Sequence, residues 1–312
     1  MSTATVLMEA TPPTSRQVRA YFAPVDRNAE TPTSFDAAAD GRFELDTPPS
    51  PWVDLGCVAG FARSCVTKIE PLLAGSPNTV RSQVRQTLEA TVKLEFMSWG
   101  KLQMALTTGA QHMNLPLVAG TTAAVCEGST ATCINVGAGN VGAFAVGQMI
   151  AVDVDYAPGA TGFVGSGVSA AYVTAAASAV IGSDTNYTRR VTLNTGRIAA
   201  VTAASLELEA PLVAGDPTTD MTVIPICGFV DREGGNFFQE WSGLFVLDGE
   251  QGDRVIFYYP RLQTMQGATE TQSALTKPLC RWGLAGAFRA LPVMDAMDGE
   301  SVVCYRSYLP AV

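Results

Sequence analysis

Residues 87–96, TLEATVKLEF, carry the clearest structural signal in the chain. An apolar set alternates there with a polar set; the first is Leu88, Ala90, Val92, Leu94 and Phe96, and the second is Glu89, Thr91, Lys93 and Glu95. Side chains on a β-strand point alternately to its two faces. The alternation therefore predicts a strand with one face in a core and the other in contact with water.

A short helix is expected directly after this strand. Ser98 is an acceptable N-cap, and Gly109 is a typical helix terminator. The apolar residues between them are Trp99, Leu102, Met104, Ala105 and Leu106. This segment predicts a small helix flanking the β structure.

Residues 1–50 are rich in Pro, Thr, Ala and Asp, with proline pairs at Pro12-Pro13 and Pro48-Pro49. This composition predicts an extended N-terminal arm. Residues 52–70 contain short β-like stretches, and PLLAGSPNT at 71–79 predicts a long, turn-rich loop.

Glycine, alanine and small polar residues dominate from residue 118, where Gly-bounded strand signals repeat. Residues 118–225 are therefore expected to form a small inserted β-barrel or sandwich. The flanking parts, 51–117 and 226–312, would form one discontinuous domain. The chain is expected to be mainly β: a β-sandwich or barrel with a short flanking α-helix, plus the inserted β domain.

Small residues alternate with arginine along one face of 280–290. Arg281, Gly283, Ala285, Ala287 and Arg289 would share that face. A surface of this kind suits close apposition or the lining of a channel.

Charged residues make up 16% of the 312 residues and hydrophobic residues 47%, against a usual charged fraction of about 25%. Either a partner covers part of the exterior, or the chain is simply rich in Ala and Gly. The net charge of −9 argues against tight binding to nucleic acid, which needs clustered Lys and Arg.

Seven cysteines are scattered without a C-x-x-C pair, which favours neither a zinc site nor a complete disulfide framework. Reduced, buried thiols are expected, with a Cys126–Cys133 bridge as the alternative. The N-terminus lacks a basic start followed by an apolar core, and no apolar run is long enough to cross a bilayer. Assembly in a cytoplasm, without a membrane, is therefore expected.

Gly137, Gly139 and Gly142 form a literal G-x-G-x-x-G sequence after the strand-like TCINV. A dinucleotide site also needs a helix whose N-terminus receives the pyrophosphate. The following residues are interrupted by Gly147, and no βα alternation follows. The motif favours a glycine turn between strands, and we expect no cofactor.

The remaining polar candidates also favour structural roles. Asp153 and Asp155 share a strand face without a third ligand, and the spacing of Asp295, Asp298 and Glu300 does not follow a calcium loop. Glu207 and Glu209 are expected to lie on a solvated strand face. His112 is the only histidine, and no nucleophile turn accompanies it. We expect no catalytic or metal-binding residue, and the chain is not expected to be an enzyme.

Several stretches resemble the major tail proteins of bacteriophages, the subunits of the tail tube. They are WVDLG at 52–56, TLEATVKLEFMSWGKLQMAL at 87–106, FFQEWSGLFV at 237–246, QGDRVIFYYPRLQ at 251–263, FRALP at 288–292 and DGESVVCYRSYLP at 298–310. The resemblance covers about residues 50–115 and 226–312. The similarity lies in the order of these segments and in their residues, and it includes no diagnostic motif.

This resemblance implies a virion protein whose rings, of six subunits each, close around a β-lined channel and stack through the arm and a long loop. Its partners would be copies of itself, the tape measure protein and the tail terminator. Double-stranded DNA would pass through the channel without specific binding. The protein would be assembled in the host cytoplasm and reside in the virion tail, where it would serve genome ejection.

Glu89, Thr91, Lys93 and Glu95 are the candidate channel-lining residues, with the two glutamates presenting negative charge to the DNA. Periodicity defines their face but not its direction, and the alternative is that this face meets outside solvent. The alternative function is that of a virion decoration or tail-tip protein whose inserted β domain contacts carbohydrate or protein.

Overall fold

The computed structural model shows a strand-dominated chain, with 54% of residues in strands and 7% in helices, which confirms the mainly β prediction. It describes residues 14–15, 17–25, 31–109, 111–117, 121–153, 194–213, 215–232, 240–265, 271–274 and 280–311.

The main antiparallel sheet closes on itself. Its strand order is β13-β14-β3-β2-β1-β11-β12-β17, and β14 also pairs with β12. Residues 261–264 of β12 pair with β14, while residues 254–258 pair with β17. The strands are β1 (Val18–Pro24), β2 (Val53–Ala74), β3 (Thr79–Phe96), β11 (Glu240–Asp248), β12 (Arg254–Thr264), β13 (Thr271–Ala274), β14 (Cys280–Leu291) and β17 (Tyr305–Leu309). The result is a barrel with β13 and β17 attached at its seam.

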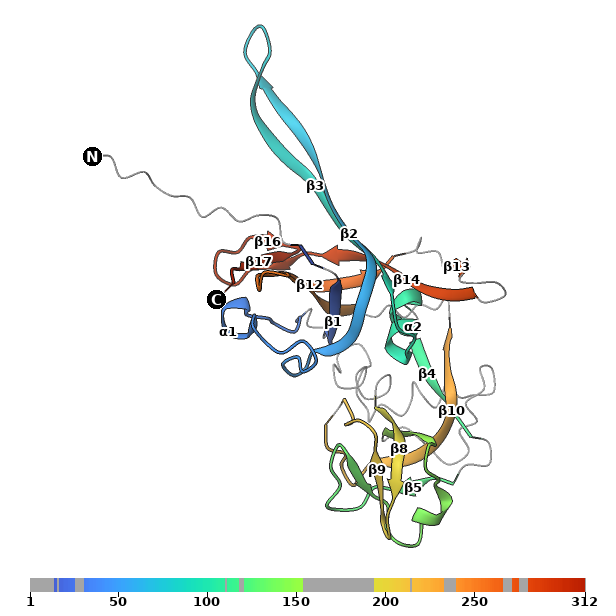
Figure 1. The fold of residues 1–312 in the computed structure, drawn as a ribbon. Helices are drawn as coiled ribbons and strands as arrows, with labels where there is room; N and C mark the ends of the chain where they lie inside the picture. Colours follow the sequence, from blue (N-terminus) through green and yellow to red (C-terminus); the bar gives the residue numbers. More distant parts are fainter. Residues whose placement is uncertain are drawn as a thin grey trace, which may run out of the picture.

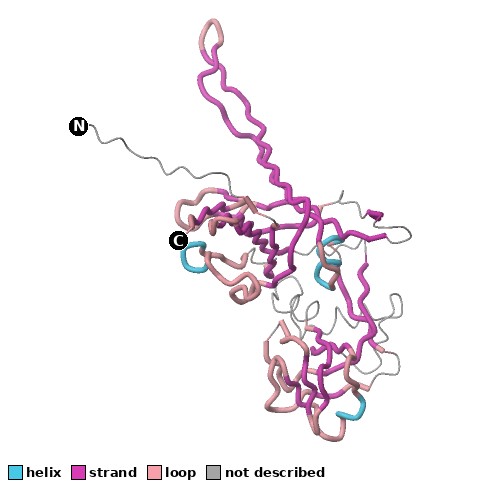
Figure 2. Tube along the Cα trace, viewed as in Figure 1, coloured by secondary structure: helices cyan, strands magenta, loops and turns pink. Residues whose placement is uncertain are grey.

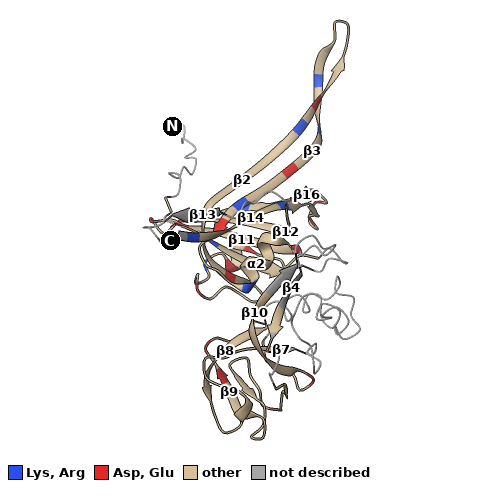
Figure 3. Ribbon diagram, turned by 90° about the vertical axis from the view of Figure 1, so that its right-hand side faces the viewer, with Lys and Arg blue, Asp and Glu red and all other residues tan. Residues whose placement is uncertain are grey.

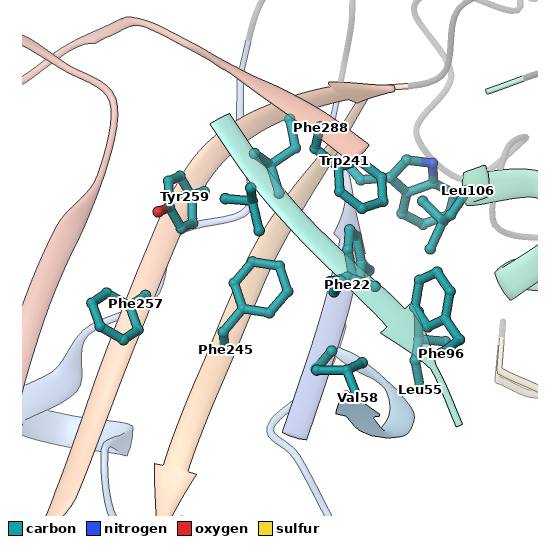
Figure 4. Packing of buried hydrophobic residues seen from close by; sticks show 14 of the residues in the cluster. Phe22, Leu55, Val58, Phe96, Leu106, Trp241, Phe245, Phe257, Tyr259 and Phe288 are labelled. Atoms are coloured by element: carbon teal, nitrogen blue, oxygen red, sulfur yellow. The ribbon is translucent and has the colours of Figure 1, made fainter. Parts of the chain in front are cut away.

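Aromatic side chains fill the barrel. The ring centroid of Phe22 lies 5.8 Å from that of Phe245 and 5.5 Å from that of Phe288. Figure 4 shows these rings gathered between the strands, with Leu106 and Phe96 beside them. Leu102 and Leu106, from helix α2 (Lys101–Thr108), belong to the same buried cluster. The small helix therefore completes the barrel core.

The predicted strand and its faces are confirmed over most of the quoted segment. Ala90, Val92, Leu94 and Phe96 are all buried in the barrel core, and Leu88 is half-buried. The helix also forms, with Gly109 as its left-handed C-cap at φ 65°. Its N-cap is Gly100, so the prediction of Ser98 at that position is wrong.

The prediction of an extended arm over residues 1–50 is wrong for β1. This strand lies between β2 and β11, and Ala20, Tyr21, Phe22 and Ala23 are fully buried. Residues 31–50, with the short helix α1 (Ala37–Asp40), cover the outside of the barrel. The Pro- and Thr-rich composition around β1 concealed a strand of only seven residues.

Residues 31–50 bury a second cluster against the outer barrel surface. Phe35, Phe43 and Leu45 pack there against Tyr21 and Trp52. The Tyr21 hydroxyl donates to the Leu45 carbonyl at 2.9 Å, which ties this segment to β1. Residues 31–50, which the sequence predicted to be part of an extended arm, thus form an outer layer of the fold.

β2 and β3 form a hairpin that extends far beyond the barrel (Figure 1). β2 has 22 residues and β3 has 18, and their pairing runs to Ala74 and Thr79. Only residues 75–78 form the turn, so the prediction of a long loop at 71–79 is wrong. In Figure 2 the hairpin is strand almost to its tip.

A second β unit has its own core, formed by residues such as Ile134, Ile150, Ile198, Leu206 and Val223. Its strand order is β4-β10-β7-β8-β9-β6, with β5 paired to β10. The elements are β4 (Gln111–Pro116), β5 (Ala123–Ala124), β6 (Cys133–Asn135), the 3₁₀ turn η1 (Val141–Ala143), β7 (Met149–Asp153), β8 (Thr195–Val201), β9 (Ser205–Leu208) and β10 (Thr222–Arg232).

The β4–β10 ribbon joins this unit to the barrel (Figure 1). β4 already belongs to the second sheet, so that sheet begins before the expected boundary at residue 118. The second unit and the β2–β3 hairpin lie at opposite ends of the molecule (Figure 1). A small hairpin of β15 (Val293–Met294) and β16 (Ser301–Val302) precedes β17.

Replacing Phe22 by Ala should destabilise the barrel by about 3–5 kcal/mol, because truncating a buried aromatic ring leaves a cavity. Phe22 is fully buried. Urea unfolding followed by tryptophan fluorescence measures the change. Val84→Ala is the control; Val84 is 47% exposed, and its substitution should change stability by no more than about 0.5 kcal/mol. Equal effects of the two substitutions would contradict the barrel core described above.

Candidate functional site

The distal hairpin, residues 66–89, is the most exposed regular structure in the described part of the chain. β1 pairs with β2 only as far as Val58, and β14 pairs with β3 only at residues 90–96. Beyond these points the two strands pair with each other alone. A two-stranded ribbon in water is marginally stable by itself, so packing against another surface would stabilise it.

Large apolar side chains project from the distal hairpin into solvent. Their exposed fractions are about half or more: Val66 61%, Ile69 53%, Leu72 50%, Leu73 57%, Val80 57% and Val84 47%. The exposed set lies on one continuous element, which distinguishes it from the scattered apolar residues of an ordinary surface. The distal hairpin is therefore a candidate interaction surface.

These apolar residues lie on both faces of the ribbon. Leu73 pairs with Val80, and both lie on the face that includes Ile69. Leu72 pairs with Ser82 on the opposite face, where Val84 also lies. A flat partner would cover only one of these faces. A groove, or two neighbouring surfaces, is needed to bury both.

The strand edges of the distal hairpin carry features that discourage edge pairing. The register shifts at Lys68/Ile69 and again at Leu72/Leu73, and Pro71 lies between the two shifts. Bulges, proline and lysine are the devices that block pairing at exposed edges. Recognition through the faces is therefore favoured over addition of a further strand.

The distal hairpin also has positive character. Residues 66–89 contain three cations, Lys68, Arg81 and Arg85, and two carboxylates, Glu70 and Glu89, which gives a net charge of +1. Figure 3 shows these charges as separate bands along the ribbon. The chain as a whole carries a net charge of −9, so this element differs in sign from the rest of the molecule.

The candidate channel-lining residues lie together on the outer side of the barrel wall. Glu89, Thr91, Lys93 and Glu95 alternate with the buried residues of β3, and their neighbours belong to β14. The β14 residues on this face include Ala285 and Ala287, which pair with Glu95 and Lys93. Small side chains make this part of the wall flat, as the sequence pattern indicated.

The electrostatics of this face differ from the expectation of a negative surface. An Arg289 Nη2 atom lies 2.8 Å from Glu89 Oε1, and an Arg281 Nη2 atom lies 3.7 Å from Glu95 Oε1. Both carboxylates are thus next to a guanidinium, and Lys93 adds a further cation. The face carries mixed charge, and the sequence could not show this because the β3–β14 register was unknown.

A groove lies over β12 and β17, with a cavity volume of about 1160 Å³. One wall is residues 31–38, and the other is residues 292–301. Tyr258 and Tyr305 lie between the walls with stacked rings, their centroids 5.7 Å apart. The volume exceeds the roughly 300–1,000 Å³ of small-molecule sites, so the groove suits a larger occupant.

Two carboxylates, Asp36 and Asp295, line this groove. The Tyr305 hydroxyl donates to Asp295 Oδ2 at 2.7 Å, and the Met297 amide donates to Asp295 Oδ1 at 2.9 Å. These hydrogen bonds stabilise the carboxylate and lower the pKa of Asp295. The same contact raises the pKa of Tyr305 to about 12.

The G-x-G-x-x-G sequence forms a turn, as expected. Gly137 has φ 78°, and the residues after it form the short 3₁₀ turn η1 between β6 and β7. The Asp298-Gly299 turn also forms, with Gly299 at φ 75°.

The cysteines whose side chains the structure describes are free thiols. Cys126 and Cys133 are free thiols, so the alternative of a bridge between them does not hold. Cys65 and Cys227 are exposed, and the expectation of burial is wrong for both. Within the part of the chain that the structure describes, no group of three His, Cys, Asp or Glu side chains is placed to hold a metal ion.

Some candidates cannot be placed. The side chains of His112 and Asp153, and all of Asp155, lie outside the described residues. Glu207 and Glu209 do lie within them: Glu207 is exposed on β9, and Glu209 forms a 3.7 Å ion pair with Arg197. No helix among those described is both long and apolar enough to cross a membrane.

No protein-family model matches the chain, and no curated protein matches its sequence at a significant level.

Replacing Tyr305 by Phe should raise the pKa of Asp295 towards its ordinary value of 3.8, because the largest stabilising hydrogen bond is removed. A carboxyl group with a lowered folded-state pKa stabilises the fold above its unfolded pKa and loses that contribution as pH falls through the folded value. The variant should therefore lose less stability than the wild type on acidification below about pH 4. Carboxyl NMR titration measures the pKa directly. Tyr308→Phe, which removes an exposed hydroxyl from the same strand, is the control.

Proposed function

We propose that the chain is a structural subunit that assembles with copies of itself into rings, and that the stacked rings form a phage tail tube. The observation that carries this proposal is the distal hairpin, with exposed apolar residues on both faces. Burying this ribbon needs a surface that the same molecule does not offer around it (Figure 1).

The geometry of the hairpin favours an assembly with repeated contacts. The ribbon protrudes from one end of a closed barrel (Figure 1), and in the proposed assembly it packs against a different surface of a neighbouring copy. A contact between unlike surfaces is heterologous, and it produces a ring if the rotation closes or a filament if it does not. A tube of stacked rings combines contacts that close each ring with contacts that continue from one ring to the next.

The layout of the barrel supports the same proposal. The stretches that resemble phage tail proteins include the strand and helix at 87–106 and the strands β11, β12 and β17. These elements belong to the barrel sheet and its flanking helix. In the proposed tube the further partners are the tape measure protein and the tail terminator.

In the proposed tube the outer face of β3 and β14 lines the channel. This face is flat, and its glutamates are paired with arginines of β14. Three cations, Lys93, Arg281 and Arg289, lie with two carboxylates on this face, so its net charge is only +1 per subunit. A surface so close to balance neither binds phosphates tightly nor repels them strongly. Passage of DNA without specific binding would follow from this balance, rather than from the repulsion expected of unpaired glutamates.

A decoration or tail-tip binding role is the second candidate. It is favoured by the second β unit, which has its own core and is attached through the β4–β10 ribbon. A unit of this kind could contact carbohydrate or protein without taking part in the barrel. Assembly experiments separate the two candidates, because a binding module does not need to polymerise.

Shortening the hairpin should abolish assembly while leaving the barrel folded. Val66 lies opposite Glu89, so residues 67–88 can be replaced by Asn-Gly, which favours a two-residue hairpin turn. The wild-type protein should form rings or tubes at high concentration in negative-stain images and light scattering. The shortened variant should remain monomeric with an unchanged near-ultraviolet circular dichroism spectrum. A wild type that stays monomeric at every concentration, or a shortened variant that still assembles, would contradict the proposal.

The channel face can be tested by the size of reagent that reaches it. In a Cys65→Ser, Cys227→Ser background, Lys93→Cys should react in assembled tubes with a small maleimide but not with a maleimide carried on streptavidin. Val146→Cys, at a position 64% exposed on the second β unit, is the control and should react with both reagents. Reaction of Lys93→Cys with the large reagent along intact tubes would place this face outside.

A further inference from the structure

The geometry points to the groove between residues 31–38 and residues 292–301 as the receptor for the distal hairpin of a second copy of this chain. The inference rests on the proposed self-assembly and names the surface that completes it. Shape, charge and the separation of the two surfaces support it.

The groove matches the hairpin in shape and size. It has two walls with Tyr258 and Tyr305 between them, and the hairpin has apolar residues on two faces. A two-walled groove covers both faces of a ribbon at once. The cavity of about 1160 Å³ is large enough for several side chains from the tip.

The lining of the groove matches the tip in polarity. Phe35, Pro292, Val293 and Met294 contribute apolar surface, and Met294 is 79% exposed. Methionine adapts to an incoming surface because its side chain is unbranched and flexible. Ile69, Leu72, Leu73 and Val80 supply the complementary apolar side chains of the ribbon.

The two surfaces have opposite charge. Asp36 and Asp295 line the groove. Arg261 also lines it, but its guanidinium lies 2.9 Å from Glu240, and both side chains are more than nine-tenths buried. The groove is therefore acidic towards an occupant, whereas the hairpin carries Lys68, Arg81 and Arg85. Complementary charge of this kind increases the association rate and fixes orientation.

The contact must join two copies. The hairpin tip lies far from α1, β16 and β17, the elements around the groove, in Figure 1, and Figure 3 also shows it far from β16. The hairpin of one molecule therefore cannot fill its own groove without leaving the barrel. Each copy has one hairpin and one groove, so every subunit can donate and receive.

Site-directed disulfide formation tests the inference on the full chain. Leu73→Cys and Met294→Cys are made separately in the Cys65→Ser, Cys227→Ser background; these positions are 57% and 79% exposed. The two purified variants are mixed at a concentration at which the wild type assembles, and oxidised with diamide. A linked species of two chains should form in the mixture and be at least about tenfold weaker with either variant alone.

The matched control pairs Leu73→Cys with Val146→Cys, which is 64% exposed but lies on the second β unit. This pair should link at least about tenfold less than the groove pair. Equal linking of the two pairs would overturn the assignment of the groove. Assembly by light scattering without linking to Met294→Cys would also overturn it while leaving the proposed function intact. A monomeric wild type would instead contradict the proposed function itself.

A charge variant gives an independent readout. Arg81→Glu combined with Arg85→Glu places carboxylates opposite Asp36 and Asp295, and should lower the linked fraction of the groove pair by about tenfold. The change lies on exposed residues, so the thermal unfolding of the barrel should be unchanged. An unchanged linked fraction would overturn the part of the inference that assigns this contact to complementary charge.

Discussion

The pairing of β14 with both β3 and β12 is the constraint on which the structure depends. It converts an open sheet into a barrel and creates an interior that six aromatic residues help to fill: Phe22, Phe96, Trp241, Phe245, Tyr259 and Phe288. Closure also removes the unpaired strand edges that an open sheet would expose. Residues 254–258 of β12 pair with β17, and residues 261–264 pair with β14. The barrel can therefore close only if these strands keep this register.

Closure explains why the hairpin protrudes. A barrel of this size uses only the part of β2 and β3 that reaches β1 and β14, and the pair continues beyond it for the whole of residues 66–89. The face that buries Ala90 and Val92 therefore continues through half-buried Leu88 to the exposed side chains of Ile69, Leu73 and Val80. The hairpin is an extension of the fold, and its apolar side chains can be buried only against a surface outside the barrel.

The sequence predicted the parts that depend on local periodicity and turn chemistry. The strict alternation in TLEATVKLEF identified the buried face of β3, and Gly109 identified the end of α2. The sequence-based prediction was wrong where it relied on composition. The seven residues of β1 lie in a proline-rich region and were assigned to an arm, and the Gly75–Asn78 turn was predicted as a longer loop. Two strand-like runs around a Gly-Ser-Pro-Asn turn were the available signal for the hairpin. The groove could not be predicted, because Asp36, Tyr258 and Asp295 meet only through long-range packing.

The same long-range pairing decides what the charged face can do. Read as a single strand, β3 offers two carboxylates and one lysine, whereas its neighbour β14 adds Arg281 and Arg289 at the positions that meet those carboxylates. Exposed ion pairs contribute only about 0–1 kcal/mol to stability, so stability gives little reason to prefer them to neutral residues. Their effect is on the field outside the wall, where opposite charges a few ångströms apart cancel within a Debye length of about 8 Å. In a ring every copy repeats the pair, so the balance of charge persists around the circumference. The charge left over per subunit, from Lys93, then sets how strongly the wall attracts a polyanion.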